Sequence, residues 1–225
     1  MKKLNRFVFL IVCVGMFYAC KPMSSTILQN ESCLPPCWNG IIPGQTSLQE
    51  VNAKLKTISA VNVSSIQTRS MLQSNDSIEF KFFSYIRENE GRIYSQGGVV
   101  QAISFSPKQG SLLLSETLQA WGVPDQYISI YYAFVETPYL ATNIIYTKQG
   151  IILDNIKDMR AEEIPKFDNN FPIQTVWFIN PTLTTRLLQN GLIDNLNNQY
   201  LHDGLKPWTG FGEIRYLEAT FDGIR

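Results

Sequence analysis

The chain has 225 residues, with 19 basic and 19 acidic side chains, four cysteines and one histidine. Since 44% of the residues are hydrophobic and 12% are aromatic, the composition excludes a disordered chain and predicts a globular body with a proper core. The formal net charge is zero and no basic stripe is present, so we expect no nucleic acid as a partner.

The first residues, 1–19, predict a signal peptide. Three basic residues precede a run of thirteen uncharged, mostly apolar residues, which is short for a membrane span. The run ends in Phe17-Tyr-Ala-Cys20, which resembles the lipobox of bacterial lipoproteins, with Phe17 in place of the usual Leu. The resemblance implies that Cys20 is diacylated and becomes the mature N-terminus. An uncleaved anchor and ordinary signal cleavage are the alternatives.

Residues 20–36 predict a lipidated tether, because residues 21–32 are polar and low in aromatics. We expect this tether to be flexible and to hold the folded body, residues 37–225, off the bilayer. Beyond the signal peptide the sequence offers no further run that is apolar and long enough to span a membrane. The expected location is therefore the cell membrane or outer envelope, with the body outside the cytoplasm.

Cys33 and Cys37 stand in a stretch rich in Pro and Gly, which excludes a regular helix or a central strand. In an exported protein the favoured interpretation is a short-loop disulfide, and two free thiols are the alternative. A zinc site would need more ligands than the single histidine adds. Farther along, Pro43–Gly44 predicts a turn.

A helix is predicted at 47–59, because Ser47 and Glu50 form a capping box and apolar residues follow at helical spacing. A predicted strand at 78–82 alternates apolar and charged residues. The other elements expected in this part are strands at 61–66, 92–94 and 99–105, with turns at 88–91 and 96–98.

The same order then recurs. A second helix is predicted at 112–121, with Ser111 or Ser115 as its cap and Gly122 just after its end. Strands are expected at 127–135, 141–147 and 151–156, the last two forming a hairpin about 148–150. A helix followed by antiparallel strands, twice, predicts an α+β fold: an antiparallel sheet with a few packing helices, in two similar halves, 37–106 and 107–225.

The last section is less regular. After a charged, irregular segment at 159–170, the pattern predicts a strand at 173–179 that contains Trp177. Asn180 is expected to cap a helix that begins with Pro181. The remaining elements expected here are a short helix within 192–204, an aromatic loop at 207–212 and a final strand at 213–220.

Two resemblances to known families rest on short motifs. Residues 36–47, Pro-Cys-Trp-Asn-Gly-Ile-Ile-Pro-Gly-Gln-Thr-Ser, resemble the P-C-W-x-G-I-x-P-G-x-T-S signature of a group of uncharacterised bacterial lipoproteins, which implies no known activity. The turn before the first helix and the Trp-Gly-Val-Pro-Asp run at 121–125 are more distantly similar to the small lipoproteins of the outer-membrane barrel-assembly machinery. That similarity implies a helix followed by antiparallel strands for one half.

No residue pattern predicts catalysis, a metal site or a cofactor. His202 lacks the context of a Ser-His-Asp triad, and no phosphate-binding glycine motif is present. Asp154 with Asp158, and Glu162 with Glu163, have the residue types of glycosidase pairs, but we interpret them as solvated charges. We therefore do not expect an enzyme.

The candidate contacts for a partner or ligand are Trp38, Trp208 and Phe211, because aromatic side chains on glycine-rich loops often bind partners or carbohydrate. The alternative is that these side chains close the end of the core. The leading hypothesis is a non-catalytic, lipid-anchored protein that serves interaction or scaffolding in the envelope. It would attach to the membrane through its lipid and bind an envelope protein or a glycan. A small-ligand or glycan-binding lipoprotein that uses the aromatic loop is the second hypothesis, and a hydrolase of envelope polymers is the third.

Overall fold

Antiparallel strands dominate the computed structural model, which describes residues 25–28, 33–71, 75–133, 135–160, 163–183, 204–220 and 223–224. Eleven of the described strands form one sheet, and helices α2 (Leu48–Leu55) and α3 (Leu114–Trp121) pack against it. The predicted α+β class is therefore confirmed. The expected signal peptide, Cys20, His202 and all but the end of the helix expected within 192–204 lie outside the described residues.

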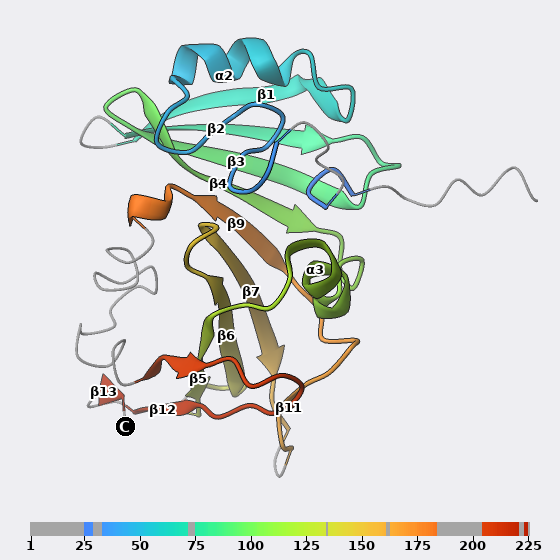
Figure 1. The fold of residues 1–225 in the computed structure, drawn as a ribbon, viewed down its shortest axis with the longest axis vertical. Helices are drawn as coiled ribbons and strands as arrows, with labels where there is room; N and C mark the ends of the chain where they lie inside the picture. Colours follow the sequence, from blue (N-terminus) through green and yellow to red (C-terminus); the bar gives the residue numbers. More distant parts are fainter. Residues whose placement is uncertain are drawn as a thin grey trace, which may run out of the picture.

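A helix followed by an antiparallel meander occurs twice along the chain (Figure 1). The first half consists of α2, β1 (Val61–Met71), β2 (Asn75–Phe82), β3 (Glu88–Gln96) and β4 (Val99–Pro107). The second half consists of α3, β5 (Gln126–Tyr132), β6 (Tyr139–Tyr146), β7 (Ile151–Asp158) and β9 (Thr175–Ile179). The shorter strands are β8 (Lys166–Phe167), β10 (Lys206–Pro207), β11 (Gly212–Glu213), β12 (Leu217–Thr220) and β13 (Gly223–Ile224).

The two meanders join edge to edge through their last strands. The sheet order is β1-β2-β3-β4-β9-β7-β6-β5-β12-β13, and β4 pairs antiparallel with β9. In each half, two backbone hydrogen bonds also join the start of the helix to the last strand or to the residues just before that strand. The bonds are Leu48 N to Gly98 O and Val100 N to Thr46 O in the first half, and Leu114 N to Phe171 O and Ile173 N to Leu112 O in the second, all 2.9 Å long. The halves are therefore related by an approximate two-fold axis between β4 and β9.

The inner face of the sheet, which α2 and α3 cover, holds the main core. Three buried apolar residues lie at matching positions on the last three strands of each half. They are Ile78, Ile93 and Ile103 in the first half and Ile144, Leu153 and Val176 in the second. These rows are the part of the core that the alternating pattern of each strand predicts.

The opposite, outer face differs between the halves. In the second half it carries isoleucines that Leu183 and Leu205 partly cover, and these form a separate core cluster. In the first half the outer face carries exposed charged side chains. They are Arg69, Lys81, Glu90 and Arg92.

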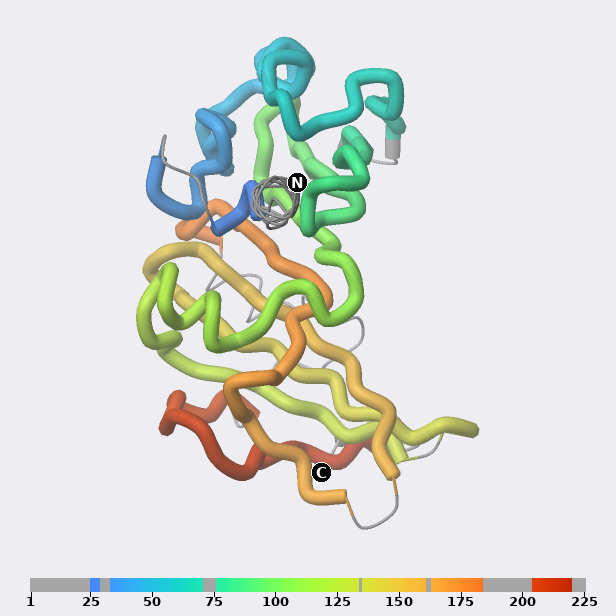
Figure 2. Tube along the Cα trace, turned by 90° about the vertical axis from the view of Figure 1, so that its right-hand side faces the viewer, coloured from blue at the N-terminus to red at the C-terminus, as the bar shows by residue number. Residues whose placement is uncertain are grey.

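The N-terminal segment 25–28 is docked on the first half, so the prediction that residues 21–32 form a flexible tether is wrong for these four residues (Figure 2). Ile27 is buried in the core. Ser25 Oγ donates a hydrogen bond of 2.6 Å to Glu88 Oε1, and Thr26 N donates to the other carboxylate oxygen. Because Glu88 is itself buried, it needs such partners, and a segment distant in sequence supplies them.

Two further predictions about local structure are corrected. Residues 88–91, expected as a turn, lie within β3, where Glu88 binds Ser25 and Gly91 leaves room for the Phe80 ring on the neighbouring strand. The cap of α3 is Leu113, whose amide donates to Glu116 Oε2, and neither expected serine serves. In the first case the partners come from other segments of the chain, whereas in the second Glu116 caps the helix locally from three residues ahead.

Candidate functional site

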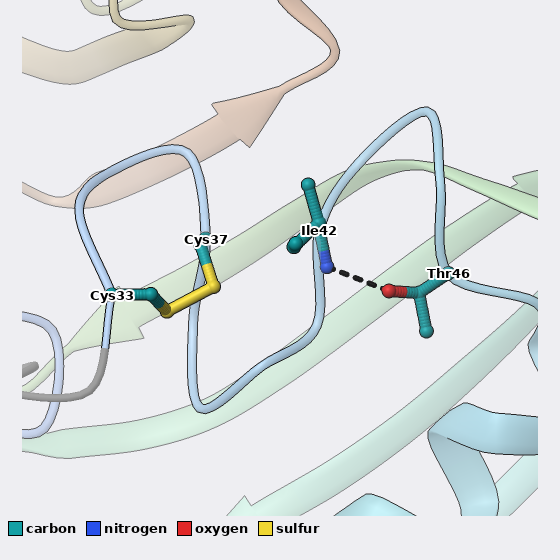
Figure 3. Close-up of a disulfide and its surroundings, with 4 residues drawn as sticks. All are labelled: Cys33, Cys37, Ile42 and Thr46. Carbon is teal, nitrogen blue, oxygen red and sulfur yellow. Dashed lines mark hydrogen bonds between the residues drawn. A yellow bond between two sulfur atoms is a disulfide. The ribbon is translucent and has the colours of Figure 1, made fainter.

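The disulfide predicted between Cys33 and Cys37 is present and closes a short loop in front of the first half (Figure 3). The next loop is closed by Ile42 N, which donates to Thr46 Oγ1 at 2.8 Å. Gly44 has a φ of +86° between these residues, as the predicted turn requires. Trp38 and Ile41, which lie between these two closures, are buried in the main core, so this part of the chain covers the inner face.

Trp38, one of the three candidate contacts, has 0% of its side chain exposed. Its ring centroid lies 5.6 Å from Phe80 and 4.9 Å from Phe105. The indole covers the inner face at the centre of the first half, so it has no surface to offer a partner. The prediction of Trp38 as a contact is wrong, because its size makes it the best filler for this part of the core.

The other two candidates lie in the second half, on the predicted aromatic loop. Trp208 is half-buried, with its ring centroid 4.8 Å from Phe167 and 6.3 Å from Tyr127. Phe211 is 49% exposed. The structure thus places Trp208 at the end of the core, as the alternative interpretation held, and leaves Phe211 as the exposed aromatic side chain of the three candidates.

A different group of aromatic residues meets on the outer face. Tyr94 on β3 and Trp177 on β9 stack with ring centroids 5.6 Å apart and an interplanar angle of 28°. Strand β4 lies between them, and its residues at this point are Ala102 and Ser104, which are small enough for the rings to meet above them. Both rings are partly exposed, so they form a surface where the two halves join.

Charged side chains extend this surface across the first half. Arg92 Nη1 lies 3.4 Å from the Tyr94 hydroxyl, and Arg92 Nη2 forms an ion pair of 2.8 Å with Glu79. Glu79 also pairs with Arg69 at 3.1 Å. Arg92 thus lies beside the Tyr94 ring, and Glu79 links it to Arg69 on β1. We call Arg69, Glu79, Arg92, Tyr94, Asp154 and Trp177 the platform.

Asp154 on β7 completes the platform in the second half. Trp177 Nε1 donates to Asp154 Oδ2 at 2.6 Å, whereas Oδ1 is buried without a hydrogen-bond partner. Burial raises the pKa of Asp154 to about 7, and the bond from Trp177 opposes that rise. The interpretation of Asp154 as a solvated charge is therefore wrong.

The two aspartates considered as a glycosidase pair do not form one. Asp154 and Asp158 lie on the same face of β7, four residues apart, which corresponds to roughly 13 Å along a strand. Glycosidase carboxyl groups lie about 5–9.5 Å apart. This spacing gives no support to a hydrolase.

A cavity of about 610 Å³ opens beside the end of β7. Several of its polar lining groups already have partners within the chain: Asn155 Nδ2 donates to Pro172 O, and Lys157 pairs with Glu163. The side-chain amide of Gln174 donates to Ile156 O and accepts from Ile156 N, so it bonds the two backbone groups that a neighbouring strand would otherwise bond. These groups mainly hold the segment 163–174 against the sheet.

Among the residues that the structure describes, no three His, Cys, Asp or Glu side chains gather into a group suited to a metal ion. None of the helices in that same part of the chain is both apolar and long enough to cross a bilayer.

Comparisons with known proteins give no relative: no family model matches the chain, and no curated protein and no solved structure matches it significantly. The platform was also missed by sequence reasoning. Arg92 and Tyr94 do alternate with buried residues on β3, which marks them as outward-facing. Their aromatic partner Trp177, however, comes from the other half, and no local pattern connects the two.

Proposed function

We propose that this protein is a non-catalytic, lipid-anchored envelope protein whose body binds another envelope protein through the platform. The observation that carries the proposal is the Tyr94–Trp177 stack with Arg92 beside it. Tyr, Trp and Arg are the residue types that contribute most binding energy at protein interfaces. Here ion pairs and a neighbouring strand hold them in position before a partner arrives, which lowers the entropy cost of binding.

The anchor part of the proposal rests on the lipobox-like run that ends at Cys20. Two acyl chains on one cysteine hold a protein stably on a bilayer, whereas one chain does not. A stable anchor would raise the local concentration of the platform near envelope partners.

The anchor is tested by intact mass spectrometry of the protein extracted from membranes, beside the Cys20→Ala variant. We expect the mass of residues 20–225 plus two or three acyl chains, and loss of that species in the variant. A protein without acyl chains would overturn the anchor. The same spectra with and without reductant and alkylation report the Cys33–Cys37 bridge.

The interaction is tested by co-purification of the acylated protein from native membranes. We expect a partner whose recovery falls at least tenfold in Tyr94→Ala and in Arg92→Glu. Tyr216→Ala is the matched control, because Tyr216 is 43% exposed and lies outside the platform. Equal recovery in all variants, or turnover of a substrate by the purified body, would contradict the proposal.

A second candidate function is binding of a small ligand or a glycan. The specific observation is that the platform combines a stacked aromatic surface with Arg92 and the partly exposed carboxylate of Glu79, polar groups that can orient a ligand on an apolar surface. A ligand that binds the folded state raises the unfolding temperature. We expect a rise with a sugar or peptide that disappears in Trp177→Ala but persists in Phe211→Ala. No rise with any member of a sugar and peptide panel would count against this function.

A further inference from the structure

We propose that one end of the first half rests on the bilayer surface, with Phe83 and Tyr85 among the lipid headgroups. This end consists of the docked segment 25–28, the turn at 56–60 and the β2–β3 connection at 83–87. The inference rests on the proposed acylation of Cys20. It adds a second contact with the membrane and fixes which part of the body faces the lipid.

The first argument is the short reach of the anchor. Because Ser25 is bonded to Glu88, only residues 21–24 separate Cys20 from the body. The five steps from Cys20 to Ser25 span at most about 18 Å, whereas a tether free as far as residue 36 would span roughly 55 Å. A body held within about 18 Å of the headgroups must present the end near Ser25 to them.

The second argument is the residues at this end. Phe83 and Tyr85 are 40% and 59% exposed, and their rings stack with centroids 5.8 Å apart. They stand on the connection that leads directly into Glu88, the residue that accepts the hydrogen bond from Ser25. Tyr side chains are enriched at the headgroup level, where the apolar ring and the polar hydroxyl are both satisfied, and the Phe83 ring adds apolar area beside Tyr85.

The third argument is the charge at this end. Tyr85 Oη donates to Ser59 O, which brings the turn bearing the exposed Lys56 beside the aromatic pair. Lys108 Nζ donates to Ser84 O within the same connection. Two acids lie here as well: Glu116 forms a bidentate pair with Arg87, and Glu88 accepts from the neutral Ser25 hydroxyl. Lys56, Arg87 and Lys108 thus exceed Glu88 and Glu116 by one positive charge, which suits anionic headgroups.

The orientation also places the platform. Tyr94 lies six residues along β3 from Glu88, which is about 20 Å at the rise of a strand. With the end near Glu88 on the membrane, the platform stands clear of the headgroups and faces along the bilayer. A partner anchored in the same membrane, or a soluble one above it, reaches it without displacing lipid.

The test uses the full, acylated protein in vesicles of phosphatidylethanolamine and phosphatidylglycerol. A photo-crosslinking phenylalanine analogue replaces Tyr85 in one preparation and Tyr216 in the control, and mass spectrometry counts lipid adducts. We expect at least about fivefold more lipid adduct from position 85, since Tyr216 lies in the second half. Equal yields from the two positions, or an adduct of position 85 to a second copy of the chain, would overturn the inference.

A second variant tests the role of the short reach. Ten Gly and Ser residues inserted between Ser24 and Ser25 add up to about 35 Å of chain. We expect the lipid adduct at position 85 to fall several-fold, while the denaturant midpoint of the body stays unchanged. An unchanged adduct yield would overturn the proposal. The intact mass distinguishes failure of the proposed acylation from failure of this inference. If acyl chains are absent, the proposed acylation is wrong. If they are present and positions 85 and 216 give equal adduct yields, only the inference about the membrane contact is wrong.

Discussion

The two halves follow the same path, yet their outer faces have opposite character. In the first half that face holds the exposed charges of the platform, with Arg92 paired to Glu79. In the second half it holds buried isoleucines beneath Leu183 and Leu205. One fold thus supports two arrangements, because only the inner face must be apolar for a half to pack on its helix. The outer face of the first half is the one available for binding.

The inner faces are more alike, but different segments build them. In the first half Trp38 covers Phe80 and Phe105, and it arrives on the disulfide loop. In the second half Trp121 covers Tyr146 and Phe178, and it stands at the end of α3. The strand residues that the two tryptophans cover lie at corresponding positions in the two halves. Each half therefore has a large ring above these positions, supplied by the disulfide loop in the first half and by α3 in the second.

The largest expected effect is at these two tryptophans. Trp38→Ala should lower the free energy of unfolding by about 3–5 kcal/mol, because it removes a completely buried indole. Trp121→Ala should cost less, about 1–3 kcal/mol, since Trp121 is only partly buried. Urea titrations of both variants check this. Equal losses in the free energy of unfolding would show that the two tryptophans contribute equally to the cores of the two halves.

Two glycines at matching positions sharpen the comparison. Gly44 and Gly110 both have positive φ, +86° and +68°. A Cβ at Gly44 would lie 2.5 Å from Asn180 Nδ2, whereas a Cβ at Gly110 would meet nothing within 4 Å. We expect Gly44→Ala to cost about 2–3 kcal/mol and Gly110→Ala about 1 kcal/mol, the second reflecting backbone strain alone. A shift of both denaturant midpoints by the same amount would contradict the packing argument.

The glutamates that begin the helices should respond differently to acid. Glu116 accepts two hydrogen bonds from Arg87, which lower its pKa below the ordinary value of 4.5, and a bond from the Leu113 amide acts in the same direction. Because the folded-state pKa is depressed, its contribution is complete above about pH 4.5 and is lost as the pH falls through the lower, folded value.

We expect Glu116→Gln to cost about 1–2 kcal/mol at pH 7, a figure reduced because the side chain is a third exposed. The variant should also lose less stability than the parent protein between pH 5 and pH 3. Glu50→Gln in the first half is the matched control, and its exposed carboxylate should give a much smaller loss. Denaturant titrations at several pH values measure both, and identical acid profiles for the parent and Glu116→Gln would refute the assignment.

A further effect of pH concerns Asp154, which stands where the first half has Tyr94. Its pKa is raised to about 7, so the folded protein keeps this proton at pH values above 3.8, the ordinary pKa of the group. The unfolded chain then releases the proton first, and stability falls as the pH rises from about 4 to about 7. We expect a fall of roughly 1–2 kcal/mol from this group, allowing for partial exposure of the residue.

Asp154→Asn keeps an oxygen for the Trp177 indole but has no charge to bury. The stability of the variant should change less between pH 4 and 7 than that of the parent protein, and the variant should be the more stable of the two at pH 8. Thermal unfolding followed across this range is the measurement. A variant that is less stable than the parent at pH 8 would show that the carboxylate is needed in its charged form.

Several local features followed from the sequence alone. The capping box of Ser47 and Glu50 is present, and Ser47 N donates to Glu50 Oε2 at 2.9 Å. The hairpin of β6 and β7 turns at Gly150, as its residue types predict. The disulfide loop, the alternating strand at 78–82 and the helix-then-meander order were also predicted. These features depend on contacts within a few residues, or on a periodicity that each segment shows by itself.

Tertiary structure decided the rest, because the deciding partner lies far along the chain. Glu88 belongs to a strand because it pairs with Pro107 of β4, and its buried carboxylate accepts from Ser25, 63 residues earlier in the chain. Trp38 is core because two strands of the first half leave a space of its size. The platform exists because β4 pairs with β9 and brings Tyr94 against Trp177. A sequence pattern reports which side of an element a residue faces, whereas which residue it meets there depends on how distant elements pair.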